Sequence, residues 1–220
     1  MKTNPMELHK AGGMAALINA VLGVTTLVVA LGLIGPAALS DHSKLLELAI
    51  HNPTPLLVQD SLKLASAVVT VVMILVLFNR LQSSAPGVMK VGALFGLLSV
   101  VCLVANAGLS LFAVWNVESI AQAQLQIGKQ INTLISLLGL AAIVFNGFWY
   151  LASSWVALRS NRLPRGPSLL GLLMGGLSLV PPLAILVLIL SIPWSLLLGQ
   201  ALLSNHWPRS TASNKPVTES

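Results

Sequence analysis

Long apolar stretches separated by short polar connectors dominate the chain. A helix needs about 20 mainly apolar residues to cross a hydrocarbon core of about 30 Å. Four stretches meet this requirement, at residues 12–33, 56–80, 91–115 and 131–158. The pattern predicts an all-α fold, a polytopic transmembrane helix bundle that forms a single domain over residues 12–204. Residues 1–11 are expected to be a cytoplasmic N-terminal segment.

A further apolar stretch is too long for one span. No charged residue lies between Ser168 and Leu203, which would measure about 54 Å as one helix at about 1.5 Å per residue. Pro181 and Pro182 lie near its middle, and adjacent prolines remove two backbone donors and interrupt a helix. We therefore expect two short spans, 168–182 and 184–203, and six spans in total. A single kinked helix, giving five spans, is the alternative.

The polar segments outside these spans predict further features. The first span follows Lys2 and Lys10 and has the form of an uncleaved signal anchor; a cleaved signal with a processing region at residues 36–38 is the alternative. Its apolar region exceeds the roughly 7 to 15 residues of a signal peptide. Charged and apolar residues alternate over 35–54, which predicts a short helix on the membrane surface. Thr54-Pro55 resembles an N-cap followed by a first-turn proline.

Two other polar segments lie further along the chain. Residues 116–130 are polar but compatible with a helix, and we expect them to extend the neighbouring helices beyond the bilayer. Residues 205–220 are rich in Ser, Thr, Pro and Asn. Such a composition cannot bury enough apolar surface to fold, so it predicts a disordered C-terminal tail.

Composition excludes several protein classes. The chain of 220 residues is 55% hydrophobic and 8% charged, and its mean hydropathy is +0.87. Charged residues are far too few to cover a soluble surface, which excludes a soluble enzyme or nucleic-acid binder. Cys102 is the single cysteine, so an internal disulfide and a thiolate metal cluster are also excluded.

Basic residues are unevenly distributed between the two sides of the predicted bundle. Lysine and arginine accumulate in cytoplasmic connectors. One side collects seven of them, Lys2, Lys10, Arg80, Lys90, Arg159, Arg162 and Arg165. The opposite connectors contain only Lys44 and Lys129, together with three acidic residues. The N-terminus is therefore expected in the cytoplasm, and six spans would also place Arg209 and Lys215 there.

Small and polar side chains share faces of the predicted helices. At about 100° per residue, Gly92, Gly96 and Ser99 form one stripe of the third span, and Gly171 and Gly175 form one on the fifth. Small residues allow close approach of helix backbones, so these residues are predicted to mediate helix packing.

Polar residues within the spans are candidates for a site. Asn19, Asn106 and Asn146 are predicted to face the interior. They could line a hydrated path or hold a polar ligand, or they could simply hydrogen-bond between helices, with about 0.6 to 2 kcal/mol per pair. Asp60 and Lys63 share a helix face at i, i+3 spacing. They could bind an ion or headgroup at the outer mouth, or form a structural pair at the helix start.

Groups needed for catalysis are missing from the spans. All four histidines, His9, His42, His51 and His206, lie outside the spans or at their ends, which leaves no histidine to ligate a haem or chlorophyll inside the membrane. The sequence contains no H-E-x-x-H, no G-x-S-x-G and no Gly-rich phosphate loop. We therefore expect no enzyme, no catalytic residue, no metal and no cofactor, although lipid or pigment could bind without histidine ligation.

The second half of the chain carries a resemblance. It lies within residues 145–204 and is carried by four short segments. They are the run Phe148-Trp149-Tyr150-Leu151, the turn Arg162-Leu163-Pro164-Arg165, the segment Gly171 to Gly176, and Ile192-Pro193-Trp194-Ser195-Leu196 with Gly199. This region resembles a family of uncharacterised bacterial six-helix integral membrane proteins, a domain of unknown function. The resemblance implies six helices, a cytoplasmic N-terminus and a multi-pass protein of the bacterial inner membrane. It supplies no catalytic or binding residues.

Together these observations favour a non-catalytic role. The first hypothesis is an accessory or assembly subunit of a larger membrane complex, which would contact membrane lipids and other integral membrane subunits, and no nucleic acid. A small transporter or channel, acting alone or as a homo-oligomer, is the alternative. A lipid- or pigment-binding membrane subunit is the third hypothesis.

Overall fold

The computed structural model describes residues 5–40, 42–117 and 125–204, and these are almost entirely helical, without any β-strand. Within them, five helices are long and apolar enough to cross a membrane. Their apolar stretches are His9–Ile34, Thr54–Leu81, Pro86–Trp115, Gly128–Ser160 and Ala184–Leu203. The predicted all-α class is confirmed, as is the presence of helices that are long and apolar enough to cross a membrane.

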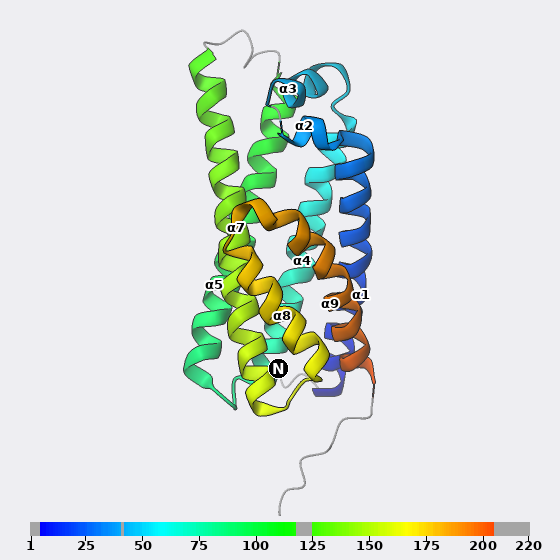
Figure 1. The fold of residues 1–220 in the computed structure, drawn as a ribbon, viewed down its shortest axis with the longest axis vertical. Helices are drawn as coiled ribbons and strands as arrows, with labels where there is room; N and C mark the ends of the chain where they lie inside the picture. Colours follow the sequence, from blue (N-terminus) through cyan, green and yellow to red (C-terminus); the bar gives the residue numbers. More distant parts are fainter. Residues whose placement is uncertain (1–4, 41, 118–124, 205–220) are drawn as a thin grey trace, which may run out of the picture.

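Four long helices form an upright bundle (Figure 1). They are α1 (Pro5–Val28), which continues as the π-helical η1 (Val29–Ile34), α4 (Thr54–Leu81), α5 (Pro86–Trp115) and α7 (Leu125–Ser160). Helix α5 packs against α4 and α7, and α1 packs against α4. At the top of Figure 1, α2 (Pro36–Ser40) and α3 (His42–His51) connect η1 to α4.

Helix α4 starts slightly earlier than its sequence predicts. Thr54 is already helical and Pro53 is the capping residue, without a side-chain capping bond. Pro55 therefore lies within the first turn, where its missing N–H costs nothing because that group would have no intrahelical partner. The predicted short helix before it corresponds to α2 and α3.

The last two helices form a hairpin against the bundle. Helix α8 (Arg165–Ser178) has 14 residues, or about 21 Å at about 1.5 Å per residue, which is shorter than a hydrocarbon core of about 30 Å. The 3-10 turn η2 (Pro181–Leu183) follows, and α9 (Ala184–Leu203) runs back. In Figure 1 the hairpin rises from the end that carries the N-terminus and turns back within the height of the bundle.

The sequence therefore identified the position of the break but not the length of the helix before it. The predicted span 168–182 corresponds to a helix that begins at Arg165 and ends at Ser178. Helix α8 packs against α7, and α9 packs against α1. The predicted tail, 205–220, and part of the predicted extension over 116–130 lie outside the described residues.

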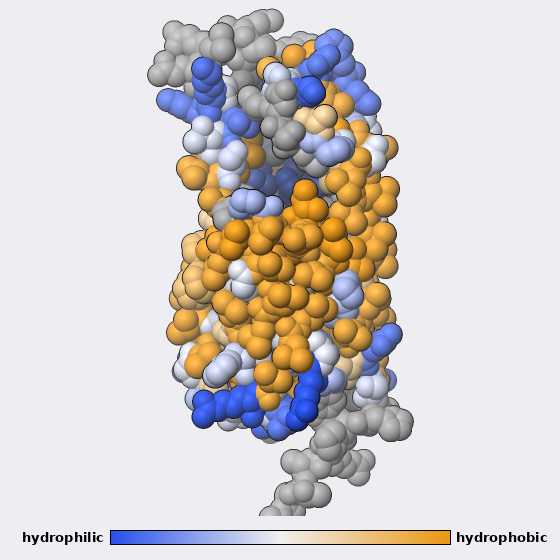
Figure 2. Space-filling model, in the orientation of Figure 1, coloured by the Kyte–Doolittle hydropathy of each residue, from blue (hydrophilic) through white to orange (hydrophobic). Residues whose placement is uncertain are grey.

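The core lies between the long helices and the hairpin. Its largest fully buried side chains include Trp149, Ile74, Leu77, Met174 and Leu198. Large apolar side chains also cover the outside, as on Val68 and Val101, which are 67% and 63% exposed. Figure 2 shows these hydrophobic residues as a broad belt, with hydrophilic residues gathered at the two ends of the molecule. This distribution is that of a protein surrounded by lipid.

Candidate functional site

A cavity of about 930 Å³ lies among the helices. Helices α1, α4, α5 and α7 supply most of its walls, α3 contributes Leu45 and Leu46, and the hairpin contributes residues that include Ser178 and Leu188. In Figure 2 the molecule is hollowed between the η2 turn and the end that carries α2 and α3, with hydrophilic residues in the depth of the hollow. The volume falls within the range of about 300 to 1,000 Å³ typical of ligand pockets.

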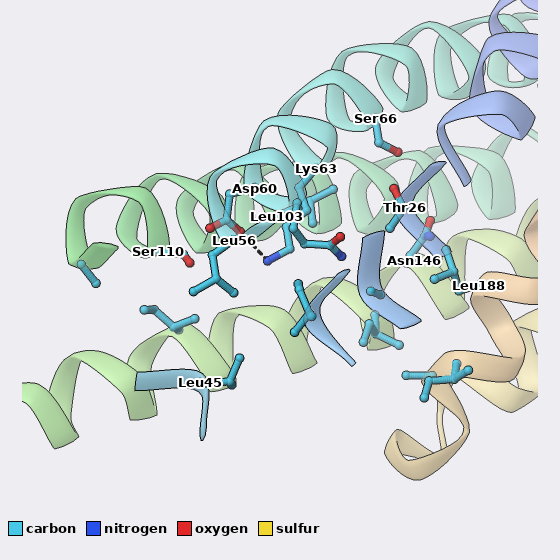
Figure 3. A pocket seen from close by; sticks show the side chains of 18 of the residues that line it. Thr26, Leu45, Leu56, Asp60, Lys63, Ser66, Leu103, Ser110, Asn146 and Leu188 are labelled. Atoms are coloured by element: carbon cyan, nitrogen blue, oxygen red, sulfur yellow. Dashed lines mark hydrogen bonds and ion pairs between the residues drawn. The ribbon is translucent and has the colours of Figure 1, made fainter. Parts of the chain in front are cut away.

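An ion pair lies in the wall of this cavity. The Lys63 Nζ donates to Oδ1 of Asp60 over 2.7 Å and to Oδ1 of Asn106 over 3.1 Å. The side chain of Asp60 is 3% exposed and that of Lys63 is 27% exposed. Asn106 Nδ2 in turn donates to the carbonyl oxygen of Ile135 over 2.7 Å. The chain of contacts joins α4, α5 and α7 and holds the ammonium group at the cavity (Figure 3).

A second polar group joins three helices further along the cavity. Asn19 Nδ2 on α1 donates to Oγ of Ser195 on α9 over 2.9 Å. Ser66 on α4 donates through Oγ to Oδ1 of Asn19 over 3.4 Å. Asn19 and Ser66 both line the cavity. These bonds fasten α9, and with it the hairpin, to the long helices.

Two buried amide oxygens have no hydrogen-bond partner among the described residues. They are Oε1 of Gln59 and Oδ1 of Asn146, and both side chains line the cavity. Figure 3 shows Asn146 near Thr26 and Leu188, away from the Asp60–Lys63 pair. The Asn146 side chain also interacts with Tyr150. Because a buried acceptor without a donor costs about 1 to 3 kcal/mol, the Gln59 oxygen calls for a ligand or a water that supplies the missing hydrogen bond.

Of the asparagines and the charged pair predicted from sequence, Asn19, Asn146, Asp60 and Lys63 line one cavity. Their hydrogen bonds form two separate groups, and Asn146 belongs to neither. Asp60, Lys63 and Asn106 are in direct contact, whereas Asn19 bonds to Ser66 and Ser195. Asn106 is buried beside the cavity and contacts Lys63 rather than the other asparagines.

The small residues of α5 lie in contacts between helices of the chain itself. A β-carbon on Gly92 would lie 2.7 Å from Cβ of Ala152 on α7, and one on Gly96 would lie 2.9 Å from Cδ1 of Ile74 on α4. Ser99 donates through Oγ to the carbonyl oxygen of Ala142 over 2.7 Å. A side chain at Gly92 would collide with the fixed β-carbon of Ala152, whereas one at Gly96 would require the end of the Ile74 side chain to shift.

Small residues also place α8 against α7. A β-carbon on Gly175 would lie 2.9 Å from the carbonyl oxygen of Gly147, and one on Gly171 would collide with Oγ of Ser154. The two backbones therefore touch directly. These contacts position the hairpin and consequently the residues that it contributes to the cavity wall, which include Ser178 and Leu188.

Sequence reasoning did not single out every polar residue of the site. Gln59, Ser66 and Lys129 also line the cavity. Gln59 and Ser66 share the face of α4 that carries Lys63, at spacings of four and three residues, so helical periodicity around the charged pair was a usable signal. Lys129 lies near the start of α7, and its contribution could not be inferred without knowing how α7 is placed.

The site has the properties of a binding pocket. No group of three or more His, Cys, Asp or Glu side chains that could hold a metal ion occurs in the described part of the chain. The charged, amide and hydroxyl groups are separated by apolar walls, which suits an amphiphilic ligand. Comparisons of the chain with protein-family models, curated proteins and solved structures find no match.

Proposed function

We propose that this protein binds a small amphiphilic molecule in its central cavity and acts as a non-enzymatic carrier for it. The observation that supports the proposal best is the cavity of about 930 Å³, whose lining combines an ion pair with amide and hydroxyl groups and apolar side chains. Polar groups inside a membrane bundle are costly and commonly belong to a ligand or ion pathway. The proposal combines the transporter and lipid-binding hypotheses drawn from the sequence.

The broken hairpin supports transport in particular. Helix α8 ends and α9 begins beside the cavity, which Ser178 and Ala184 both line. In many transporters, substrates bind near the bilayer midplane beside helices that are interrupted there.

The accessory-subunit hypothesis has less support. It was based on the small-residue faces, the lack of catalytic groups and the short connectors, which leave no extramembrane domain. Gly92, Gly96, Gly171 and Gly175 instead contact helices of the same chain. Contacts with other integral membrane subunits would then have to use the large apolar residues of the outer surface.

We further propose a bacterial inner-membrane location with the N-terminus in the cytoplasm. Lys10, Arg80, Lys90 and Arg162 lie at helix ends on the side of the bundle where α1 starts, and Arg162 Nη1 donates to the carbonyl oxygen of Arg80 over 3.0 Å. Because basic residues are retained in the cytoplasm, the cavity mouth would face the outer side. A hairpin that enters and leaves on the cytoplasmic side would place both ends of the chain in the cytoplasm, as the six-span prediction does.

The first test is to identify what occupies the cavity. The full chain would be purified from its source membrane in mild detergent, and accompanying small molecules would be determined by mass spectrometry. A cavity-filling variant, Thr26→Phe, and a control on the lipid-facing surface, Val101→Phe, would be treated identically. We expect a molecule that accompanies the wild type and the control but is depleted at least about tenfold with Thr26→Phe, since about 1.4 kcal/mol is tenfold in affinity.

Either of two other results would contradict the proposal. Molecules present equally in all three preparations would belong to the lipid annulus rather than the cavity. A stoichiometric set of other membrane subunits, with no small molecule in the cavity, would favour the accessory-subunit hypothesis.

A further inference from the structure

We propose that the ligand is an anionic, hydroxyl-bearing lipid that enters sideways from the outer leaflet, with its headgroup bound at Lys63. This inference rests on the proposed function and specifies the class of ligand and its route. The shape of the cavity, the charges in its wall and an unpartnered amide beside them all support it.

The shape supports lateral entry. Helix α8 lies against α7 and α9 lies against α1, so the hairpin fills the space between α1 and α7 in the half of the bundle nearest the N-terminus. Above the hairpin turn the surface is hollowed (Figure 2). The hollow adjoins the upper edge of the apolar belt in Figure 2, below the end that carries α2 and α3, and hydrophilic residues form part of its rim. A molecule in the outer leaflet can therefore reach the cavity without leaving the bilayer.

The apolar lining suits a chain that follows the headgroup. Ala30 and Ile34 from the α1 side, and Ile185 and Leu188 from α9, line the cavity between the surface and the interior. Ile185 is 50% exposed at the start of α9. An acyl chain that moves along such a wall stays in apolar surroundings throughout, so entry does not expose its methylene groups to water.

The charges favour an anion. Asp60, Lys63 and Lys129 are the charged residues that line the cavity in the described part of the chain, and together they carry a net charge of +1. Lys63 has three N–H donors, of which two are used by Asp60 and Asn106. The third can donate to a phosphate oxygen. Asp60 is the more buried partner and keeps the ammonium group in place.

The unpartnered amide of Gln59 favours a headgroup with hydroxyl donors. Gln59 precedes Lys63 by four residues and shares its face of α4. Its Oε1 is buried without a hydrogen-bond partner among the described residues. A hydroxyl beside the phosphate, as in a glycerol headgroup, would donate to this oxygen after a small rotation of the amide. A choline headgroup has neither a hydroxyl donor nor a net negative charge.

The experiment measures ligand selectivity on the full chain. The purified, delipidated protein would be titrated with phosphatidylglycerol, phosphatidylcholine and inorganic phosphate, with binding read by native mass spectrometry and thermal stability. We expect one phosphatidylglycerol per chain, bound at least about tenfold more tightly than phosphatidylcholine, with no stabilisation by inorganic phosphate. The preference should fall to about twofold or less in Lys63→Met, and Lys90→Met, a basic residue at the opposite end, should retain it.

A second variant keeps the test valid if the Lys63→Met protein does not fold. The double variant Asp60→Asn/Lys63→Met removes both charges together, so it leaves no isolated charge, and it should also lose the preference. Equal binding of both lipids, abolished by Thr26→Phe, would overturn the anionic ligand but retain the proposed function. Stabilisation by inorganic phosphate equal to that by lipid would overturn lateral entry. If neither lipid binds tightly and the source membrane yields a cavity molecule of another class, the anionic-lipid inference is overturned and the proposed function is retained.

Discussion

At the scale of single residues, Asp60 and Lys63 neutralise each other's charge in the cavity wall. Asp60 is nearly fully buried and its partner is mostly buried. A buried carboxylate is expensive unless it is paired, because the surrounding medium cannot replace the lost hydration. The contacts of the pair support the structural alternative drawn from the sequence, and the proposed function adds a binding role to it.

The energetic consequence can be measured by a double-mutant cycle. Lys63→Met leaves Asp60 without its cation, and we expect it to destabilise the protein by about 1 to 3 kcal/mol. The double variant Asp60→Asn/Lys63→Met should recover at least half of this loss, since no charge remains unpaired. Thermal unfolding in detergent provides the comparison. The single variant Asp60→Asn completes the cycle, and a double variant whose loss equals the sum of the two single losses would show that the pair makes no net interaction.

The spacing of Asp60 and Lys63 was enough to predict their contact, because residues three apart lie on one face of a helix. The bond from Lys63 to Asn106 was not predictable in the same way. It joins residues 43 positions apart and depends on how α4 and α5 are aligned, for which periodicity within one helix gives no information. The same reason explains why the three asparagines could be placed inside the bundle but not assigned partners.

At the scale of elements, the α8–α9 hairpin depends on close backbone contact with α7. Gly175 and Gly176 offer a matched comparison, because a β-carbon on Gly175 would meet Leu151 and the Gly147 carbonyl, whereas one on Gly176 would meet nothing within 4 Å. We expect Gly175→Ala to destabilise the protein by about 1 to 3 kcal/mol through overpacking. Gly176→Ala should leave the unfolding temperature unchanged or slightly higher. Similar destabilisation by both substitutions would contradict the observed orientation of α8.

The hydrogen bonds of Asn19 hold the other arm of the hairpin. Asn19→Leu removes the bonds to Ser195 and Ser66, and we expect a loss of about 0.6 to 2 kcal/mol. The loss should be accompanied by faster hydrogen exchange in α9 than in α5, because Ser195 is on α9. Thr25→Val is the matched control, since the exposed Thr25 hydroxyl bonds to the Val21 carbonyl of its own helix. Uniform exchange changes in α5 and α9 would argue against a separable hairpin.

The elements were predicted from sequence to different degrees. Proline chemistry located the break at Pro181 and Pro182, and the apolar stretches located α4 and α5 to within a few residues of their helix ends. The shortness of α8 was not predicted. Helix α8 already ends at Ser178, before the 3-10 turn that Pro181–Leu183 form. Hydropathy cannot separate a short helix that packs against its neighbours from one that crosses a bilayer, since both are apolar.

At the scale of the whole molecule, the membrane orientation is predicted from the end of the bundle where α1 starts, because the basic residues gather there. The start of α1 and the end of α9 lie at one end of the bundle, where a β-carbon on Gly199 would lie 3.1 Å from the carbonyl oxygen of Gly13. Reporters fused to the N-terminus and to the C-terminus should therefore report the same compartment, and the positive-inside rule predicts the cytoplasm. Opposite compartments would require α9 to cross the membrane alone, in conflict with the hairpin.

The proposed carrier requires a polar cavity that opens toward the outer side and is closed toward the cytoplasm. Cysteine labelling tests this directly, in a Cys102→Ala background, with Ser110→Cys in the cavity wall and Val101→Cys on the lipid-facing surface as control. A charged, membrane-impermeant maleimide should label Ser110→Cys when added to the outer side and not when added to the cytoplasmic side, and should leave Val101→Cys unlabelled from both sides. Labelling of Ser110→Cys from the cytoplasmic side alone, or from neither side, would contradict the account.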